Sequence, residues 1–104
     1  MRWKCTFDGD LVLPSTVTVL EAYAFAQTGF KHIYMPDNFE EIPEGLFYRC
    51  KELIDTVVIP SKVNHIAQKA FSGCKSLTSV TISNSVTSIG GYAFSDCENL
   101  NSVV

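Results

Sequence analysis

The residues best suited to chemistry are four cysteines and two histidines. The cysteines are separated by 45, 24 and 23 residues: Cys5, Cys50, Cys74 and Cys97. Zinc sites use pairs of ligands two to four residues apart, so this spacing does not predict a metal site. We interpret the cysteines as small buried residues whose thiols lie near backbone carbonyls. Disulfides remain an alternative for a secreted chain.

The histidines do not complete a recognisable catalytic motif. His32 and His65 fall at different places in the sequence pattern described below, and neither G-x-S-x-G nor H-E-x-x-H occurs. The turn at Asp8–Asp10 lacks the rest of a calcium loop. The sequence therefore predicts that the chain is not an enzyme and has no catalytic residue, no cofactor and no metal.

Composition excludes further classes of partner. The chain has 104 residues, with 8 Lys plus Arg against 11 Asp plus Glu, and a net charge of −3. Nucleic acids and anionic membranes attract basic patches, so we expect neither as a partner. The longest apolar run is 22–26, which is too short for insertion into a membrane. Because 46% of residues are hydrophobic, the chain can fold around a core.

A repeat of 22 to 24 residues organises the sequence. It is defined by one phenylalanine per unit: Phe25, Phe47, Phe71 and Phe94. Eleven residues before them stand three prolines and a serine: Pro14, Pro36, Pro60 and Ser83. Units this short cannot bury their own apolar side, so stacked units must share one core. We therefore place the phenylalanines in that core rather than in an aromatic binding site.

Each repeat is expected to supply one strand and one short helical segment. The strands are predicted at 11–13, 33–35, 57–59 and 80–82, and proline ends three of them. The stretch 91–97 and its equivalents are compatible with a helix. Strands lie about 4.8 Å apart and helices need roughly 10 Å, so stacking bends the array with the strands inside. We expect a right-handed α/β solenoid with a parallel concave sheet and short convex helical segments.

The cysteine column follows the phenylalanine column by three residues. Cys50, Cys74 and Cys97 occupy it, with Thr28 in the first unit. This position lies towards the wide side of the coils. We therefore expect neighbouring cysteines to be too far apart for a disulfide.

The last repeat resembles a known family. Residues Leu77 to Cys97 read LTSVTISNSVTSIGGYAFSDC. This run is similar to the BspA-like leucine-rich repeat, whose unit resembles LTSVTIPxSVTSIGxxAFxxC. The resemblance covers about residues 11–104 and is weakest in the second unit, where Leu46 and Phe39 replace Ala and Val. It implies a leucine-rich-repeat solenoid.

The resemblance also implies a function. Members of this family are mostly bacterial cell-surface or secreted proteins, which implies an extracellular or cell-surface location. It implies a non-catalytic protein-binding or adhesion module with a protein ligand, such as a host or extracellular-matrix protein. The alternative is an architectural spacer or stalk segment that displays another domain.

The outward strand positions form the candidate partner-binding face, because repeat proteins use this extended surface for partners. Its candidate residues are His32, Tyr34, Thr56, Val58, Ser79 and Thr81, and Asp10 and Val12 continue it in the first unit. A face with so little charge is expected to bind through shape and hydrogen bonds. An ordinary solvated sheet face is the other interpretation.

We treat residues 1–104 as a single domain with repeats at about 11–32, 33–56, 57–79 and 80–104. Residues 1–10 are either a capping hairpin or the tail of an earlier repeat. Val103 and Val104 begin another strand, which suggests a fragment of a longer array. An uncapped end exposes an unpaired edge, so self-association through it is expected.

Overall fold

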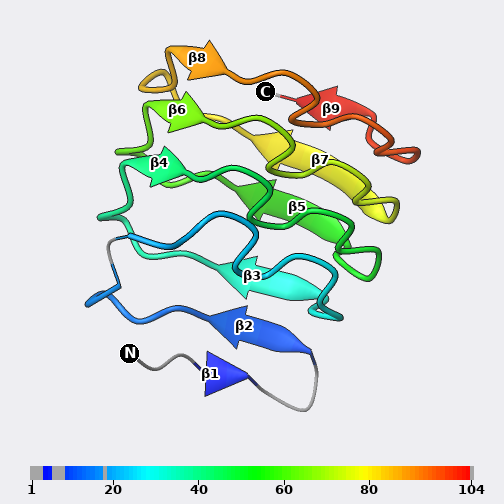
Figure 1. The fold of residues 1–104 in the computed structure, drawn as a ribbon, viewed down its shortest axis with the longest axis horizontal. Helices are drawn as coiled ribbons and strands as arrows, with labels where there is room; N and C mark the ends of the chain where they lie inside the picture. Colours follow the sequence, from blue (N-terminus) through cyan, green and yellow to red (C-terminus); the bar gives the residue numbers. More distant parts are fainter. Residues whose placement is uncertain (1–3, 6–8, 18, 104) are drawn as a thin grey trace.

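The chain winds into coils that stack on one another, and each coil is close to one sequence repeat (Figure 1). The computed structural model describes residues 4–5, 9–17 and 19–103. The predicted strands are present, each ending one residue earlier than expected, and a fifth follows them: β2 (Asp10–Val12), β3 (His32–Tyr34), β5 (Asp55–Val58), β7 (Leu77–Thr81) and β9 (Ser102–Val103). The pairs β2–β3, β5–β7 and β7–β9 are parallel, as predicted.

The expected single sheet is divided in two. One sheet has the order β1-β2-β3 and the other β5-β7-β9. The break coincides with Asp55, which has a φ of 63° and begins a register shift in β5. A left-handed residue at the start of a strand turns the backbone out of the extended conformation, so β5 does not continue the ladder of β3. The coils remain joined where the Ile54 N–H donates to the Lys31 carbonyl at 3.0 Å.

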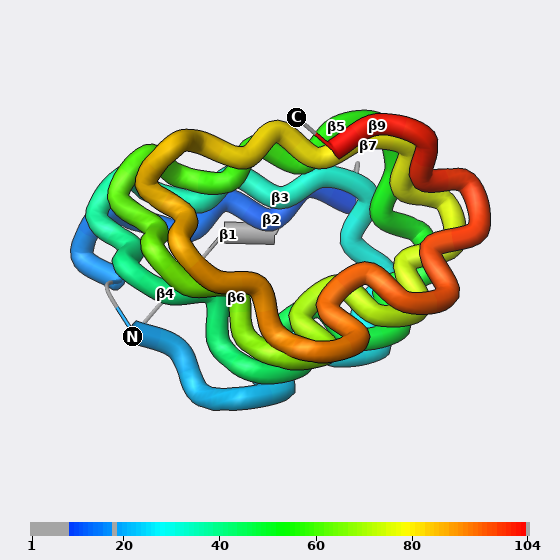
Figure 2. The backbone as a smooth tube through the Cα atoms, turned by 90° about the horizontal axis from the view of Figure 1, so that it is seen from above, coloured from blue at the N-terminus to red at the C-terminus, as the bar shows by residue number. Residues whose placement is uncertain are grey.

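A second side of each coil carries two-residue strands that the sequence did not reveal. They pair in parallel in the order β4-β6-β8: β4 (Glu41–Ile42), β6 (His65–Ile66) and β8 (Ser88–Ile89). Seen along the stack, the coils form a ring with β5, β7 and β9 on one side and β4 and β6 on the other (Figure 2). The coils that carry β4, β6 and β8 are therefore tied to one another on this side of the core as well.

The predicted convex helices are wrong, because the described residues contain no helix. A helix needs each N–H to bond the carbonyl four residues earlier. Here the Phe47 N–H donates instead to the Ala70 carbonyl at 2.8 Å, and the Phe71 N–H to the Ala93 carbonyl at 2.8 Å, both on the next coil. The N–H groups of Gly45 and Arg49, two residues before and after Phe47, also donate to carbonyls of the next coil. The N–H groups of Leu46 and Tyr48 instead donate to the carbonyls three residues earlier in their own coil.

Left-handed residues make this alternation possible. The positions two before and two after each column phenylalanine all have positive φ: Tyr23, Gln27, Gly45, Arg49, Lys69, Gly73, Tyr92 and Asp96. Such a conformation costs about 1–2 kcal/mol at a residue other than glycine. The hydrogen bonds between coils offset that cost, so the convex segments depend on stacking for their shape.

The phenylalanine column forms the centre of the core, as predicted. Ring centroids lie 6.0 Å apart for Phe25 and Phe47, and 5.5 Å apart for both Phe47–Phe71 and Phe71–Phe94. Phe25, Phe47 and Phe71 are buried, and Phe94 in the last coil is half-buried. An offset stack of this kind is a favourable aromatic arrangement.

At the amino-terminal end, β1 (Lys4–Cys5) pairs antiparallel with β2 and sets Lys4 opposite Val12. An antiparallel partner is what a hairpin cap supplies, so we keep the cap as our proposal for this end. Trp3 and Phe7, on which the hairpin pattern also rests, lie outside the described residues, as does Val104. The described part of the chain contains no helix able to cross a membrane.

Candidate partner-binding face

Alternation along β2, β3, β5 and β7 turns every second side chain away from the core. We call these outward positions the strand face: Asp10, Val12, His32, Tyr34, Thr56, Val58, Ser79 and Thr81. The register places Val12 beside Tyr34, and Val58 beside Thr81. The structure thus brings together the six residues predicted for partner binding, while their binding role stays a prediction.

Tyr34 and Val58 are the most exposed large apolar side chains of the strand face, at 52% and 61%. They come from β3 and β5, the two strands between which the sheet is divided. Both line an open hollow of about 180 Å³ on the surface. Its lining combines apolar residues with two hydroxyls and one carboxylate: Ile33, Tyr34, Met35, Asp37, Thr56, Val58 and Pro60. Folding therefore creates a recess where the sequence shows two separate segments.

His32 lies between two carboxylates from neighbouring coils. Its Nδ1 is 2.9 Å from Asp10 Oδ1, and its Nε2 is 3.5 Å from Asp55 Oδ2. The hydrogen bonds to Asp10 and then Asp55 raise the pKa of His32 above its ordinary value, although partial burial opposes this. The His32 and Tyr34 rings are stacked with centroids 6.5 Å apart, which helps to orient Tyr34.

On β5 and β7 the other strand-face residues, Thr56, Ser79 and Thr81, carry hydroxyls. The hydroxyls of Thr56 and Ser79 lie 2.8 Å apart across β5 and β7. Next to them, the Thr78 hydroxyl donates to the Asp55 carbonyl at 3.0 Å. The end of the face that holds Ser79 and Thr81 therefore offers hydroxyls rather than apolar area to a partner.

The cysteine column contacts backbone carbonyls, as predicted. The thiols of Cys50, Cys74 and Cys97 donate to the phenylalanine carbonyls of the preceding coil at 3.2, 3.3 and 3.1 Å. All three are free; Cys50 and Cys74 are buried and Cys97 is half-buried. Their side chains fill the space between coils and satisfy carbonyls that a helix would otherwise bond.

The thiols of Cys74 and Cys97, in neighbouring coils, influence each other's titration, and the expectation that they are too far apart for a disulfide stays a prediction. Interaction with the Cys97 thiol and burial raise the pKa of Cys74, while interaction with the Cys74 thiol lowers the pKa of Cys97. Burial raises the pKa of Cys50.

A histidine–serine contact on the second sheet escaped the sequence reading. His65 Nδ1 lies 2.5 Å from Ser88 Oγ, and His65 Nε2 lies 3.9 Å from Glu41 Oε2. The three residues occupy one column across β4, β6 and β8, which only the register reveals. Glu41 is too distant for a good hydrogen bond, and Glu41 and His65 are both substantially exposed to water. This geometry resembles a surface ladder more than a sheltered acyl-transfer site.

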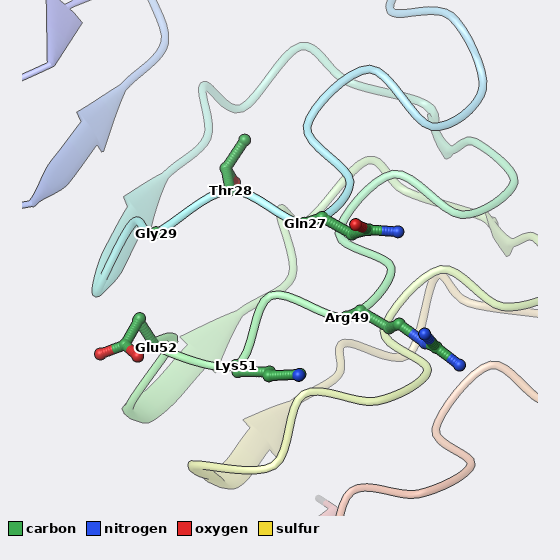
Figure 3. A pocket seen from close by; sticks show the side chains of 6 residues that line it. All are labelled: Gln27, Thr28, Gly29, Arg49, Lys51 and Glu52. Atoms are coloured by element: carbon green, nitrogen blue, oxygen red, sulfur yellow. The ribbon is translucent and has the colours of Figure 1, made fainter.

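Two adjoining hollows lie along the edge where the convex segments turn back towards the strands. One, of about 280 Å³, is lined by Gln27, Thr28, Gly29, Arg49, Lys51 and Glu52. In Figure 3 the side chains of Gln27, Arg49 and Lys51 extend in one direction while Glu52 points away. The other, of about 370 Å³, shares Arg49 and Lys51 and adds both acidic and basic groups. Their mixed charges do not select one class of ligand.

Comparisons with known proteins agree with this geometry. Residues 4–104 match, in six copies, the family model described as the BspA type leucine rich repeat region. The chain is similar to the crystal structure of a leucine rich cell surface protein from Faecalibacterium prausnitzii A2-165, with a TM-score of 0.81 and 27% identity. That match covers 92% of this chain and 31% of the other, so the chain spans about a third of its length. No curated protein matches.

Proposed function

Because the chain belongs to the BspA-type leucine-rich repeat family, we propose that it is a non-catalytic protein-binding or adhesion module of a cell-surface or secreted protein. We propose the strand face as its binding surface. The observation that carries this is the hollow between Tyr34 and Val58, where adjacent coils expose apolar side chains around one recess. Contiguous exposed apolar area with a polar surround is typical of a contact site.

The location and the class of partner rest on the same relatives. The solved neighbour is described as a cell surface protein, which supports an extracellular or cell-surface location for this chain. We propose a protein as its partner, such as a host or extracellular-matrix protein. The net charge of −3 gives no support for nucleic acid, and we propose no membrane insertion.

An architectural spacer remains the second candidate, favoured by one observation. The neighbour is longer than this chain, which covers 31% of it, so a segment like this one can serve as part of an extended array. A spacer would use its ends rather than its strand face. A spacer is expected to self-associate through its carboxyl-terminal coil.

The binding proposal is tested with the 104-residue chain immobilised and exposed to purified extracellular-matrix proteins. The double variant Tyr34→Ser/Val58→Ser removes the apolar rim of the hollow. The matched control Ile89→Ser/Tyr92→Ser removes exposed apolar area elsewhere, from residues that are 49% and 71% exposed. We expect the chain and the control to bind at least one matrix protein, with the strand-face variant at least tenfold weaker.

Binding that both double variants weaken equally would contradict the strand face as the binding surface. A complete lack of binding across the panel would favour the spacer. Circular dichroism of each variant, matched to the unmodified chain, shows that the coils are intact.

A further inference from the structure

We propose that the hollow between Tyr34 and Val58 receives one basic side chain, Lys or Arg, of the protein partner. This inference rests on the proposed function, because it names the chemistry that the strand face recognises. The size of the hollow is the first argument. At about 180 Å³ it is smaller than pockets for whole ligands, which are about 300–1,000 Å³, and suits a single side chain.

The walls of the hollow match the stem of a basic side chain. Met35 and Val58 give it apolar residues from two coils, while the Ile33 side chain is buried in the core. Lys and Arg bury their methylene stems along apolar surface and keep the charged end in a polar setting. Val58, which is 61% exposed, gains cover from such a stem without any change in the fold.

The polar groups of the hollow select a positive charge. Asp37 is the charged residue of its lining, and its carboxylate can pair with an ammonium or a guanidinium. The Tyr34 ring, 52% exposed, presents a π face that attracts a cation. A bound metal ion fits less well, because hard cations take several oxygen ligands and the hollow supplies one carboxylate among apolar walls.

Two further carboxylates lie near Tyr34 and also favour a positively charged ligand. Asp10 and Asp55 lie on either side of His32, which stacks against Tyr34, so this group carries two acidic side chains for one histidine. Neither these two carboxylates nor the nearby Lys31 and Lys62 line the hollow, so Asp37 is the charge that a ligand in it meets directly. A basic residue of a partner therefore meets a complementary surface.

The probes are four acetylated and amidated peptides, Val-X-Val-Thr, in which X is Lys, Arg, norleucine or Glu. Norleucine keeps the straight stem of lysine and lacks its charge. Each peptide is titrated into the ¹⁵N-labelled 104-residue chain, to concentrations on the order of 10 mM because a single side chain binds weakly. We expect the Lys and Arg peptides to shift amide signals of residues 33–37 and 56–60, with the norleucine peptide about fivefold weaker.

Three variants complete the test. Asp37→Asn is expected to weaken Lys-peptide binding, because the ammonium then keeps only the Tyr34 ring as its partner. Tyr34→Leu is expected to weaken Lys-peptide binding while it keeps apolar area. Asp96→Asn makes the same charge change at an exposed position on a convex turn and is expected to leave binding unchanged.

Equal affinities for the Lys and norleucine peptides would overturn the basic-side-chain assignment, as would an unaltered Lys affinity in Asp37→Asn. Shifts confined to other residues, or none at all, would overturn it too. The matrix-protein panel judges the proposed function separately. Loss of matrix binding in the Tyr34→Ser/Val58→Ser variant, with no Lys preference here, would leave the strand face standing and reject only its specificity.

Discussion

At the residue scale, the phenylalanine stack is the part of the core most sensitive to truncation. Phe71 is fully buried and stacks on both Phe47 and Phe94. We expect Phe71→Ala to lower the free energy of unfolding by about 3–5 kcal/mol, the range for a buried aromatic residue. Denaturant melts measure it, with Tyr92→Ala as the exposed control. A loss of unfolding free energy below about 1 kcal/mol would show that Phe71 is not part of the core.

The carboxylates around His32 make stability depend on pH. A folded-state pKa above the unfolded value of about 6.5 means that the folded chain binds the proton more tightly. The His32 contribution to stability is therefore fully present below pH 6.5 and is lost as pH rises through the folded pKa. NMR titration of the His32 ring signals should give a pKa above 6.5 that falls in Asp10→Asn. Glu41→Gln, beside His65, should leave the His32 pKa unchanged. A His32 pKa at or below 6.5 would contradict the contacts of His32 with Asp10 and Asp55.

The thiols should react in the order of their burial. Among Cys50, Cys74 and Cys97, we expect a thiol reagent to label Cys97 first and the other two only through opening of the fold, because Cys97 is half-buried and Cys50 and Cys74 are buried. The raised pKa values of Cys50 and Cys74 act in the same direction. Peptide mapping after timed labelling separates the sites. Prompt labelling of Cys74 in the native chain, or a protein mass two units low, would contradict free buried thiols.

Residue identity and spacing were enough to predict the phenylalanine core and the thiol–carbonyl contacts. The side-chain contacts of His32 and His65 could not be predicted from the sequence. Each joins residues 22 to 24 positions apart, and the Asp55 contact also depends on a left-handed residue that no local signal announced.

At the scale of the elements, the close approach of consecutive coils is tested at Gly90. Its N–H donates to the Ile66 carbonyl at 2.7 Å, and a Cβ there would overlap the Gln68 backbone nitrogen and lie 2.8 Å from the Ala67 carbonyl carbon. We expect Gly90→Ala to destabilise by about 1–3 kcal/mol, the usual cost of overpacking.

Gly91→Ala is the matched control for that substitution, because a Cβ at Gly91 meets no atom within 4 Å. Thermal melts of the two variants give the comparison. Equal stabilities of Gly90→Ala and Gly91→Ala would mean that the coils are further apart at this point than the hydrogen bonds indicate.

Strands were more predictable than convex segments for a physical reason. Alternating apolar residues and a following proline identify a strand locally. The stretch Tyr92–Asp96 has no residue that forbids a helix, and its actual shape comes from N–H groups that bond the neighbouring coil. Two-residue strands such as β6 are too short to show alternation, so the second sheet was also invisible in the sequence.

At the scale of the whole molecule, the stack has chemically different ends. In each inner coil the N–H of the column phenylalanine bonds the next coil, while Phe94 lies in the last complete coil described. Ile89 and Val103, on β8 and β9, are 49% and 50% exposed there. Strand edges with exposed apolar side chains favour pairing with another chain.

We therefore expect the isolated 104-residue chain to associate with increasing concentration. Sedimentation of the chain and of Ile89→Lys/Val103→Lys measures this, and the charged variant should remain monomeric because buried lysines are costly at an interface. Addition of a polar capping repeat after Val104 should also abolish association and raise stability. A monomeric unmodified chain at high concentration would contradict end-to-end pairing.

The repeat columns predicted the arrangement of the strand face within each of its two sheets, because one residue per coil falls into register in β2–β3 and in β5–β7. The hollow beside Tyr34 was not predictable, since it forms where the sheet is divided between β3 and β5. The right-handed winding and concave curvature of the solenoid stay predictions.

The strand face as a partner-binding surface is tested most directly by a hydrogen-exchange footprint of the chain bound to a matrix protein that it recognises. Binding slows exchange where the partner excludes water and restricts opening. We predict protection in residues 32–37 and 55–60 and none in 90–96. Protection confined to the convex segments, or to the carboxyl-terminal strand Ser102–Val103, would contradict the assignment of binding to the strand face.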